Sequence, residues 1–370
     1  MLRVLHCLYD APGNPWLGGG GAVRAFELYR RLAGRIDLTL ATGNFPGARD
    51  EVIDGVRYVR LGSALNYPLS RLSYARAATK LLRAGQYDAA IYDFSVYTPI
   101  RVPQNRPVGY NVYHLTGPTA HERWGGVAGA MIDRLERRLL SRARIVAASS
   151  SYTAQGIEPL LPAGTPIQLI GSGVPDVLFD LQRREQDYLL YLGRLDLFHK
   201  GLDVLLDAAV PLAREFPQFE LRIAGTGRDR AEVERRIAAL GLNNWVRMLG
   251  HVSDAQRLEL LAGARVFLTP SRMEGFGLAA AEAMAAAVPV VATRAGSLTE
   301  VVADAGVLVP VEDAGALARE TAALLHDDTR RAALSERARA HAQQHFRWAS
   351  AAEAHYKFLE RVAALPQSSA

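Results

Sequence analysis

The feature that most constrains the fold is the alternation of short apolar runs with longer stretches of helical periodicity. In the first half, apolar runs at 4–9, 38–41, 56–60, 89–92, 108–112 and 144–148 are interrupted by helical stretches at 22–32, 70–83 and 127–141. Strands without a polar face, separated by helices, predict a parallel sheet covered on both faces. The alternation resumes after residue 187, with strands at 188–193, 220–224, 246–249, 266–269 and 288–292. We therefore predict an α/β protein.

The chain is too long for one ordinary core, because 370 residues correspond to about two domains. Residues 162–180 have little periodicity and several Gly and Pro residues, which is typical of a linker. We predict two doubly wound Rossmann-like domains, at 1–172 and 173–345. Ligands of parallel sheets bind beyond the carboxyl ends of the strands, so we expect the site in a deep inter-domain cleft.

The net charge of +5 is unevenly spread: residues 1–172 carry +8 and the remainder carries −3. Of the 14 tyrosines, 11 lie in the first 152 residues. A basic, tyrosine-rich first domain suits an anionic membrane surface or an anionic substrate. Nucleic acid is not an expected partner, because no Lys/Arg run or recognisable binding module accompanies the charge.

The composition is that of a globular chain, with 49% hydrophobic and 22% charged residues. No stretch reaches the roughly 18–20 apolar residues of a membrane helix, and we expect no signal peptide, because no charged leader precedes an apolar block. The single cysteine, Cys7, can form neither an internal disulfide nor a thiolate metal site. These features predict a cytoplasmic protein.

Three segments carry residues suited to binding phosphates and sugars. The first is a run of glycines, 18–21, between the first strand and the first helix, where backbone amides can approach a phosphate. A flexible turn is the alternative reading, and no Gly-Lys-Ser/Thr follows as in a P-loop. The second is Gly193-Arg194 with Lys200-Gly201 after the strand at 188–193. Two cations beside a helix N-terminus suit a pyrophosphate, although a solvated basic loop would have the same composition.

The third segment, SRMEGFGLAAAEAMAAAVPVVA, places Glu274 in a loop and Glu282 on the second turn of the following helix. Carboxylates there can accept hydrogen bonds from sugar or ribose hydroxyls. The free amides of Phe276, Gly277 and Leu278 are expected to point at the same space. Because the helix is nearly all apolar, Glu282 must have a polar partner.

These elements, in this order, resemble retaining glycosyltransferases of the GT-B fold, family 4 in the usual sequence classification. The resemblance extends over nearly the whole chain. The segments 143–150, 296–300 and 306–310 also match the family pattern, and Phe346-Arg347-Trp348 opens a final helix, 346–370, like the one that crosses back to the first domain.

The resemblance implies a nucleoside-diphosphate-sugar donor, bound mainly by the second domain, while the first domain binds the acceptor. Arg194 and Lys200 would hold the diphosphate, so that no metal ion or other cofactor is expected. Glu282 would accept hydrogen bonds from the ribose and Glu274 from the transferred sugar. The remaining donor contacts would come from Gly19, Gly20, Gly250, Val252 and the amides of Phe276, Gly277 and Leu278.

His114 follows the strand at 108–112, and the family often has a histidine here, near the primary hydroxyl of the transferred sugar. A satisfied loop histidine is the alternative. The resemblance implies front-face attack, in which the leaving phosphate accepts the proton of the acceptor. Catalysis by Arg194, Lys200, Glu274 and His114 would then rest on positioning and on stabilising the departing diphosphate.

The acceptor is a sugar, a glycolipid or another small molecule. Trp16, Tyr113 and Trp124 are candidate platforms for its rings, although aromatic packing at strand ends explains them equally well. The basic amphipathic stretch 127–150 could rest on an anionic membrane, or be a domain helix with a solvated basic face.

The reaction expected from the resemblance is hexose transfer in the synthesis of a bacterial surface glycan or glycolipid. Two alternatives are a sugar-nucleotide epimerase of the same fold and a non-catalytic nucleotide-sugar-binding partner. A nicotinamide dehydrogenase is disfavoured, because Ala224-Gly225-Thr226-Gly227 is an incomplete glycine fingerprint.

Overall fold

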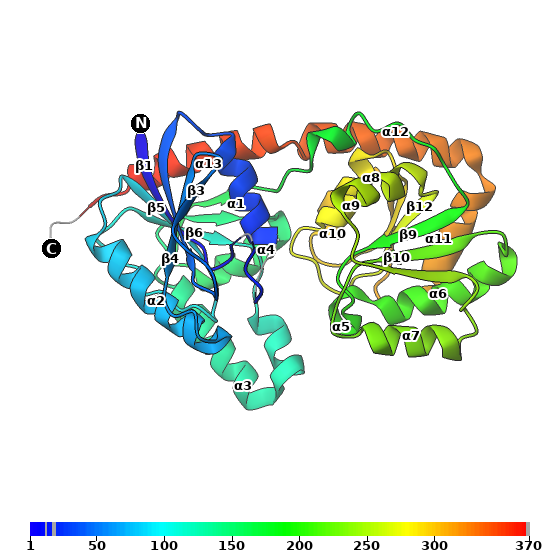
Figure 1. The fold of residues 1–370 in the computed structure, drawn as a ribbon, viewed down its shortest axis with the longest axis horizontal. Coiled ribbons are helices and arrows are strands. Elements are labelled where there is room, and N and C mark those ends of the chain that lie inside the picture. Colours follow the sequence, from blue (N-terminus) through cyan, green and yellow to red (C-terminus); the bar gives the residue numbers. More distant parts are fainter. Residues whose placement is uncertain (12, 17–19, 368–370) are drawn as a thin grey trace. The chain divides into compact units, whose positions relative to one another are not determined.

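The computed structural model describes residues 1–11, 13–16 and 20–367, apart from the side chains of 118, 119 and 122–124. The chain divides into two compact units (Figure 1). Unit 1 comprises Met1–Ser172 with Trp348–Ala370, and unit 2 comprises Gly173–Arg347. The final segment, which the sequence analysis begins at Phe346, therefore joins unit 1 two residues later than predicted.

Unit 1 is built on one sheet with the strand order β3-β4-β2-β1-β5-β6-β7-β8. All neighbouring strands pair in parallel except β3, which pairs antiparallel with β4 at the edge. The strands are β1 (Leu2–Cys7), β2 (Ile36–Gly43), β3 (Glu51–Ile53), β4 (Val56–Leu61), β5 (Ala89–Asp93), β6 (Val108–Val112), β7 (Val146–Ala148) and β8 (Ile167–Leu169). The helices are α1 (Gly20–Arg30), α2 (Tyr67–Ala84), α3 (Gly117–Leu140), α4 (Ser151–Ile157) and α13 (Trp348–Ala363), with a 3₁₀ turn at Glu158–Leu160.

Unit 2 has a six-stranded, fully parallel sheet in the order β11-β10-β9-β12-β13-β14. Its strands are β9 (Tyr188–Leu192), β10 (Glu220–Ala224), β11 (Val246–Gly250), β12 (Val266–Thr269), β13 (Val290–Thr293) and β14 (Val307–Val309). Its helices are α5 (Leu197–Lys200), α6 (Leu202–Glu215), α7 (Arg230–Ala239), α8 (Asp254–Gly263), α9 (Leu278–Ala285), α10 (Leu298–Val302), α11 (Ala314–His326) and α12 (Asp328–His345), with a 3₁₀ turn at Asp176–Leu178. Two parallel α/β units confirm the predicted fold class.

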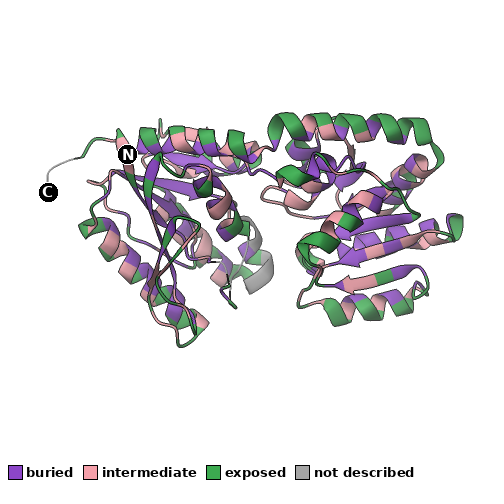
Figure 2. Cartoon of the chain, turned by 45° about the horizontal axis from the view of Figure 1, so that its top comes forward, coloured by how far each residue is buried: buried purple, intermediate pink, exposed green. Residues whose placement is uncertain are grey.

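Buried strands explain the apolar runs in the sequence, because every residue of β5, β6 and β9 is buried. Figure 2 shows that exposed residues lie mainly on the outward faces of the helices. In unit 1, α13 packs closely on the sheet at Gly109, where an added Cβ would lie 2.7 Å from Val362 and 3.0 Å from Phe358. Because Gly109 has no side chain, the final helix can pack directly against β6.

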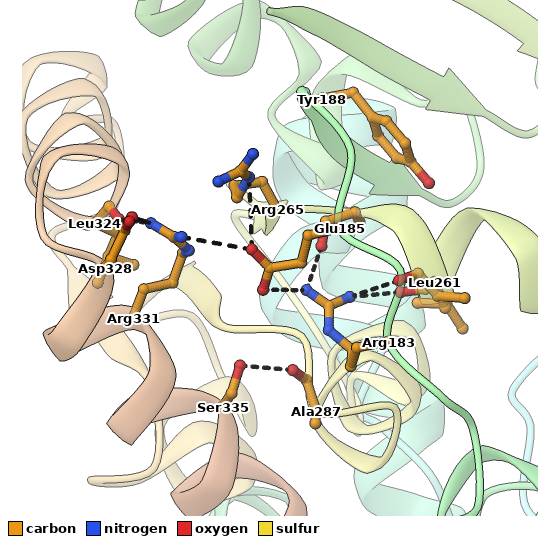
Figure 3. Close-up of polar contacts among 12 residues, drawn as sticks. Arg183, Glu185, Tyr188, Leu261, Arg265, Ala287, Leu324, Asp328, Arg331 and Ser335 are labelled. Carbon is orange, nitrogen blue, oxygen red and sulfur yellow. Dashed lines mark hydrogen bonds and ion pairs between the residues drawn. The ribbon is translucent and has the colours of Figure 1, made fainter.

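An arginine–glutamate cluster fixes the edge of unit 2 at which the strands begin (Figure 3). Glu185 lies 3.1 Å from Arg183, 3.4 Å from Arg331 and 3.5 Å from Arg265. Arg183 also donates to the carbonyl of Leu261 at the end of α8, and Arg331 donates to that of Leu324 near the end of α11. Since these carbonyls lack partners within their helices, the arginines cap both helices.

Candidate functional site

The strand order of unit 2 determines where its sheet has a ligand-binding crevice. Numbered along the chain from β9, the order is 3-2-1-4-5-6, so the chain moves to one side from β9 and to the other side from β12. The loops that follow these two neighbouring strands diverge, and the gap between them is where open parallel sheets bind ligands. Both predicted phosphate- and sugar-binding segments of unit 2 are these loops.

The loop after β9 presents one cation to solvent and fixes the other. Arg194 is exposed, and its side chain has no hydrogen bond or ion pair among the described residues. Asp196 caps α5 by accepting from the amide of His199, and its other oxygen lies 3.0 Å from Nδ1 of that histidine. Lys200 is the last residue of the short helix α5 and directly precedes Gly201, the N-cap of α6.

The loop after β12 brings Glu274 to Lys200. Nζ of Lys200 donates to Oε1 of Glu274, and both side chains are largely buried. Oγ of Ser271 donates to the same oxygen at 3.0 Å. The carbonyl of Glu274 accepts from both the amide and Oγ of Ser297, at 3.2 and 3.0 Å. The predicted cation and the predicted carboxylate therefore meet at the crevice, in fixed positions.

The start of α9 supplies backbone amides next to this pair. Gly277 caps the helix in the left-handed region, with φ of 94°, and an added Cβ would lie 2.7 Å from Leu298. Within the described part of the chain, no acceptor pairs with the amides of Phe276, Gly277 or Leu278. The ring of Phe276 packs edge-on against Phe346, with centroids 5.8 Å apart, which fixes the loop from the other side.

Glu282 has the polar partner that its apolar helix required. Nη1 of Arg257 lies 2.9 and 3.2 Å from its two carboxylate oxygens. Burial raises the pKa of Glu282, and the charge of Arg257 opposes this rise. Arg257 was not predicted from the sequence, because it lies on α8 among ordinary polar residues. The need for a polar partner was visible in the sequence, but neither its identity nor its position was.

Gly250 and Val252 were predicted to lie against the base. Gly250 is the last residue of β11, the edge strand that pairs with β10, and Val252 lies two residues beyond it. Gly250 has φ of 70°, and its carbonyl accepts from the amide of Gly225 at 2.7 Å. Val252 is half-buried against the core of unit 2, while His251 is exposed.

Arg272 was also not predicted from the sequence. It donates two hydrogen bonds, of 2.9 and 2.7 Å, to the carboxylate of Asp203 and so ties the β12 loop to α6.

The candidate site residues of unit 1 lie in different elements and differ in how far they are buried. Gly20 is the first residue of α1, and Gly19 lies outside the described residues, as does the side chain of Trp124 in α3. Trp16 is half-buried, with its ring 6.3 Å from that of Tyr67. His114 is exposed in the loop after β6.

Tyr113 belongs to a buried polar network, so it is more constrained than a free stacking platform. Its hydroxyl donates to Oδ2 of Asp93 at 2.9 Å and accepts from Asn111 at 2.8 Å. Asp93 also lies 2.7 Å from Nε2 of His6, whose Nδ1 lies 2.8 Å from the hydroxyl of Tyr29. Burial alone would raise the pKa of Asp93, but its partners hold it below the ordinary value.

Comparison with known proteins places this geometry in a family. A family model described as "Glycosyl transferases group 1" matches residues 179–341, and "Glycosyltransferase Family 4" matches 18–177. The D-inositol 3-phosphate glycosyltransferase of Xylanimonas cellulosilytica is 40% identical over 412 aligned positions, which cover 96% of this chain and 94% of that protein. The chain belongs to the group 1 glycosyltransferases.

Other relatives of this glycosyltransferase match over shorter regions. Seven of them, named as mannosyltransferases or D-inositol 3-phosphate glycosyltransferases, are 31–40% identical over 44–65% of this chain. The chain spans only 38–60% of their length in these alignments, roughly half. These matches support the family and leave the substrates open.

Solved structures confirm the GT-B fold of the glycosyltransferase. Sucrose-phosphate synthase from Thermosynechococcus elongatus has a TM-score of 0.81 at 21% identity, with 98% of this chain and 99% of that chain covered. Anabaena Alr3699/HepE in complex with UDP-glucose has a TM-score of 0.75 at 20% identity, with 98% and 100% covered. Identities this low establish the fold alone.

The described residues contain no cluster of three or more His, Cys, Asp or Glu side chains that could hold a metal ion. Nor does any helix within them have the length and apolar character needed to cross a membrane.

Proposed function

We propose that this glycosyltransferase transfers a hexose, with retention, from a nucleoside-diphosphate sugar to a hydroxyl group of an acceptor. The observation that carries the proposal is the meeting of Lys200 and Glu274 at the switch point of unit 2, beside Arg194 and three amides that have no acceptor among the residues the structure describes. The cations and the amides suit the oxygens of the diphosphate, and the carboxylate suits the hydroxyls of the sugar.

In the proposed complex, Arg194 and Lys200 bind the diphosphate, and Glu274 accepts hydrogen bonds from the hexose. Glu282 binds the ribose, while the segment from Gly250 to Val252 faces the base. The complex of the related fold HepE with UDP-glucose supports a donor of this class. Guanidinium and ammonium groups would supply the positive charge that a divalent ion provides elsewhere, so we propose a metal-independent reaction.

The proposed reaction exchanges two bonds at the anomeric carbon. The bond to the diphosphate oxygen breaks, and an acceptor oxygen forms the new bond on the same face. The leaving phosphate takes the acceptor's proton, so no protein carboxylate needs to act as nucleophile. Arg194 and Lys200 stabilise the charge that develops on the diphosphate, and His114 helps to orient the hexose.

Unit 1 is the proposed acceptor-binding part, with Trp16, Tyr113 and Trp124 as contacts. Relatives named for phosphatidyl-myo-inositol, D-inositol 3-phosphate and O-antigen chains favour a role in surface glycan or glycolipid synthesis. A cytoplasmic enzyme would meet a lipid acceptor at the inner membrane face. Val127 and Met131, 81% and 70% exposed on basic α3, support contact with that surface.

The test of the donor site is thermal stabilisation by UDP, GDP, ADP and their sugars. A ligand at 100 times its dissociation constant should stabilise the protein by about 2.7 kcal/mol. Lys200→Ala should lose this response, whereas Lys357→Ala, which removes an exposed lysine of α13, should keep it. No response to any nucleotide, or an unchanged response in Lys200→Ala, would refute the assignment.

The reaction itself is tested with the stabilising donor. Transfer with retention gives a product with the donor's anomeric configuration, which NMR of the purified product detects. Consumption of donor without acceptor, with an altered sugar as product, would instead identify an epimerase. Transfer that persists unchanged in excess EDTA would support the metal-independent form.

A further inference from the structure

The sheet of unit 1 has its own switch point, between β1 and β5. From β1 the chain moves to β2 on one side, and β5 lies on the other side. Tyr9 follows β1, while Ser95 and Tyr97 follow β5, so these residues border the crevice where an open sheet binds ligands. Arg71 reaches the same place from the first half of α2. The proposed function leaves this arginine without a role.

Arg71 is buried and sits among aromatic rings. Only 9% of the residue is exposed. The carbon of its guanidinium lies 4.8 Å from the ring centre of Tyr9, 5.4 Å from that of Tyr67 and 5.3 Å from that of Tyr97. Such contacts stabilise a cation but do not neutralise it.

The hydrogen bonds of Arg71 are all to neutral groups. It donates to the carbonyl of Tyr97 at 3.2 Å, to the hydroxyl of Tyr67 at 2.6 Å and to Oγ of Ser95 at 3.1 Å. One hydrogen on each terminal nitrogen therefore has no acceptor among the described residues. Each terminal nitrogen thus has one hydrogen left for a further acceptor.

No carboxylate in the described part of the chain forms an ion pair with Arg71. Asp93, the acidic end of the adjacent strand, is occupied by His6, Asn111 and Tyr113. A buried charge without a counter-charge is costly unless something pairs with it. The arrangement is therefore complete only when an anion is present.

Aromatic side chains that are at least partly exposed lie beside the cation. Tyr97 is 42% exposed, and Trp16 and Tyr67 are half-buried. A ring with an apolar face can lie on these side chains while its charged substituent reaches Arg71. Cation and rings together describe a site for a sugar or polyol that carries an oxyanion.

We propose that the acceptor of this glycosyltransferase is anionic, and that Arg71 binds its phosphate or carboxylate group with Trp16, Tyr67 and Tyr97 around it. The inference rests on the proposed function in assigning the acceptor to unit 1. The anion site itself can be tested without any transfer, so that failure of one proposal is distinguishable from failure of the other.

The experiment uses the full chain with Lys200→Ala, which weakens the phosphate site of unit 2. Its melting temperature is measured with increasing inorganic phosphate, against sodium chloride of equal ionic strength. Arg71→Gln is then added. The matched control is Arg106→Gln, because Arg106 also lies over a tyrosine, 4.6 Å from the ring of Tyr87, and donates to Gly85. Arg106 lies just before β6, so it is at the end of the sheet where the strands begin, whereas Arg71 lies at the end where β1 and β5 finish.

We expect the apparent affinity for phosphate to fall at least tenfold in Arg71→Gln and less than twofold in Arg106→Gln. General effects of phosphate on folded proteins act equally on both variants. Equal responses of the two variants, or no response of the parent beyond chloride, would overturn the proposal. Acetate in place of phosphate separates the two sources: an Arg71-dependent response to acetate assigns a carboxylate, and a response to phosphate alone assigns a phosphate ester.

Arg71→Lys keeps the proposal testable where Arg71→Gln does not fold. It retains the positive charge and loses the two-pronged geometry, so phosphate affinity should fall without disappearing. Full retention of affinity in Arg71→Lys would contradict binding through both terminal nitrogens.

Discussion

Arg257 holds the buried carboxylate of Glu282 in a two-oxygen contact, at 2.9 and 3.2 Å. The carboxylate side chain is 12% exposed and the arginine side chain 30%. The contact joins the first turn of α8 to the middle of α9, beside the loops that carry Lys200 and Glu274. Arg257 thus makes a charged residue tolerable in an apolar helix and fixes where its carboxylate lies.

Removing Arg257 should destabilise the protein. Arg257→Met leaves Glu282 buried without a cation, which we expect to lower the free energy of unfolding by about 1–3 kcal/mol. Urea unfolding at neutral pH measures the change. Arg235→Met is the control, because Arg235 pairs with Glu232 on α7 while its side chain is 75% exposed. That loss should stay within about 0.5 kcal/mol, and equal losses would refute the role of Arg257.

Glu282 also predicts a pH dependence with a definite sign. Burial raises its folded-state pKa above the ordinary value of 4.5, so the folded protein binds this proton more tightly than the unfolded chain. This group therefore reduces stability as the pH rises from about 4.5 towards the folded pKa. Glu282→Gln removes the loss, so its stability relative to wild type should increase over that window and then level off. A difference that stays flat from about pH 4 to about pH 8 would contradict this.

The positions of long buried strands could be predicted from the sequence better than those of strands that depend on pairing with a neighbour. The strand at 108–112 coincides with β6, all five residues of which are buried. β8 lies inside the predicted linker and was missed, since it has only three residues and none of them is fully buried. Short edge strands are defined by their neighbours, here β7, rather than by their own composition.

The same distinction applies to the site. Lys200 and Glu274 were recognised because each lies in a segment that follows a buried strand, and the parallel sheet brings these segments together. Arg257 and Arg272 were not recognised, because their partners are 25 and 69 residues distant, and nothing local marks an ion pair across that separation. Arg71 was missed because the groups around it come from distant parts of the chain, such as Ser95 and Tyr97, and only the structure brings them together.

Gly201 should be indispensable to the site. It links α5 to α6 with φ of 60°, and an added Cβ would lie 2.1 Å from the carbonyl oxygen of Pro270 in the β12 loop. Gly241 has a similar φ of 70° and open space around it, so Gly241→Ala should cost only about 1–2 kcal/mol of backbone strain. Gly201→Ala should cost about 1–3 kcal/mol more and should weaken nucleotide binding. Equal unfolding free energies for the two variants would disprove the close approach.

His355 should make the docking of α13 sensitive to acid. It is buried, with Nε2 3.0 Å from the hydroxyl of Tyr29, and burial lowers its pKa well below the ordinary 6.5. The unfolded chain then binds a proton that the folded protein does not, so stability falls as the pH drops below about 6.5. His355→Gln should remove this part of the acid sensitivity, whereas His326→Gln, at a histidine whose side chain is 62% exposed, should not. Parallel pH profiles for wild type and His355→Gln would contradict the assignment.

Tyr113 offers a test that separates positioning from stacking. Its hydroxyl is held by Asp93 and Asn111, and its carbonyl accepts from Ser149 at 2.9 Å and Thr153 at 3.1 Å. His114 is the next residue, so these bonds fix the backbone from which the proposed sugar-facing histidine extends. Tyr113→Phe keeps the ring and removes only the hydroxyl. We expect transfer to fall at least about tenfold, because small displacements at a reacting centre are costly.

The matched control is Tyr74→Phe. The hydroxyl of Tyr74 is also buried in unit 1 and donates to the carbonyl of Ala41 at 3.0 Å, away from the β6 loop. Both variants should lose about 1 kcal/mol of stability, but only Tyr113→Phe should lose transfer rate, measured as kcat with saturating donor and acceptor. If Tyr113 served only as a platform for an acceptor ring, phenylalanine would serve as well. Unchanged transfer in Tyr113→Phe would therefore assign the residue to stacking and reject a positioning role for the network around Asp93.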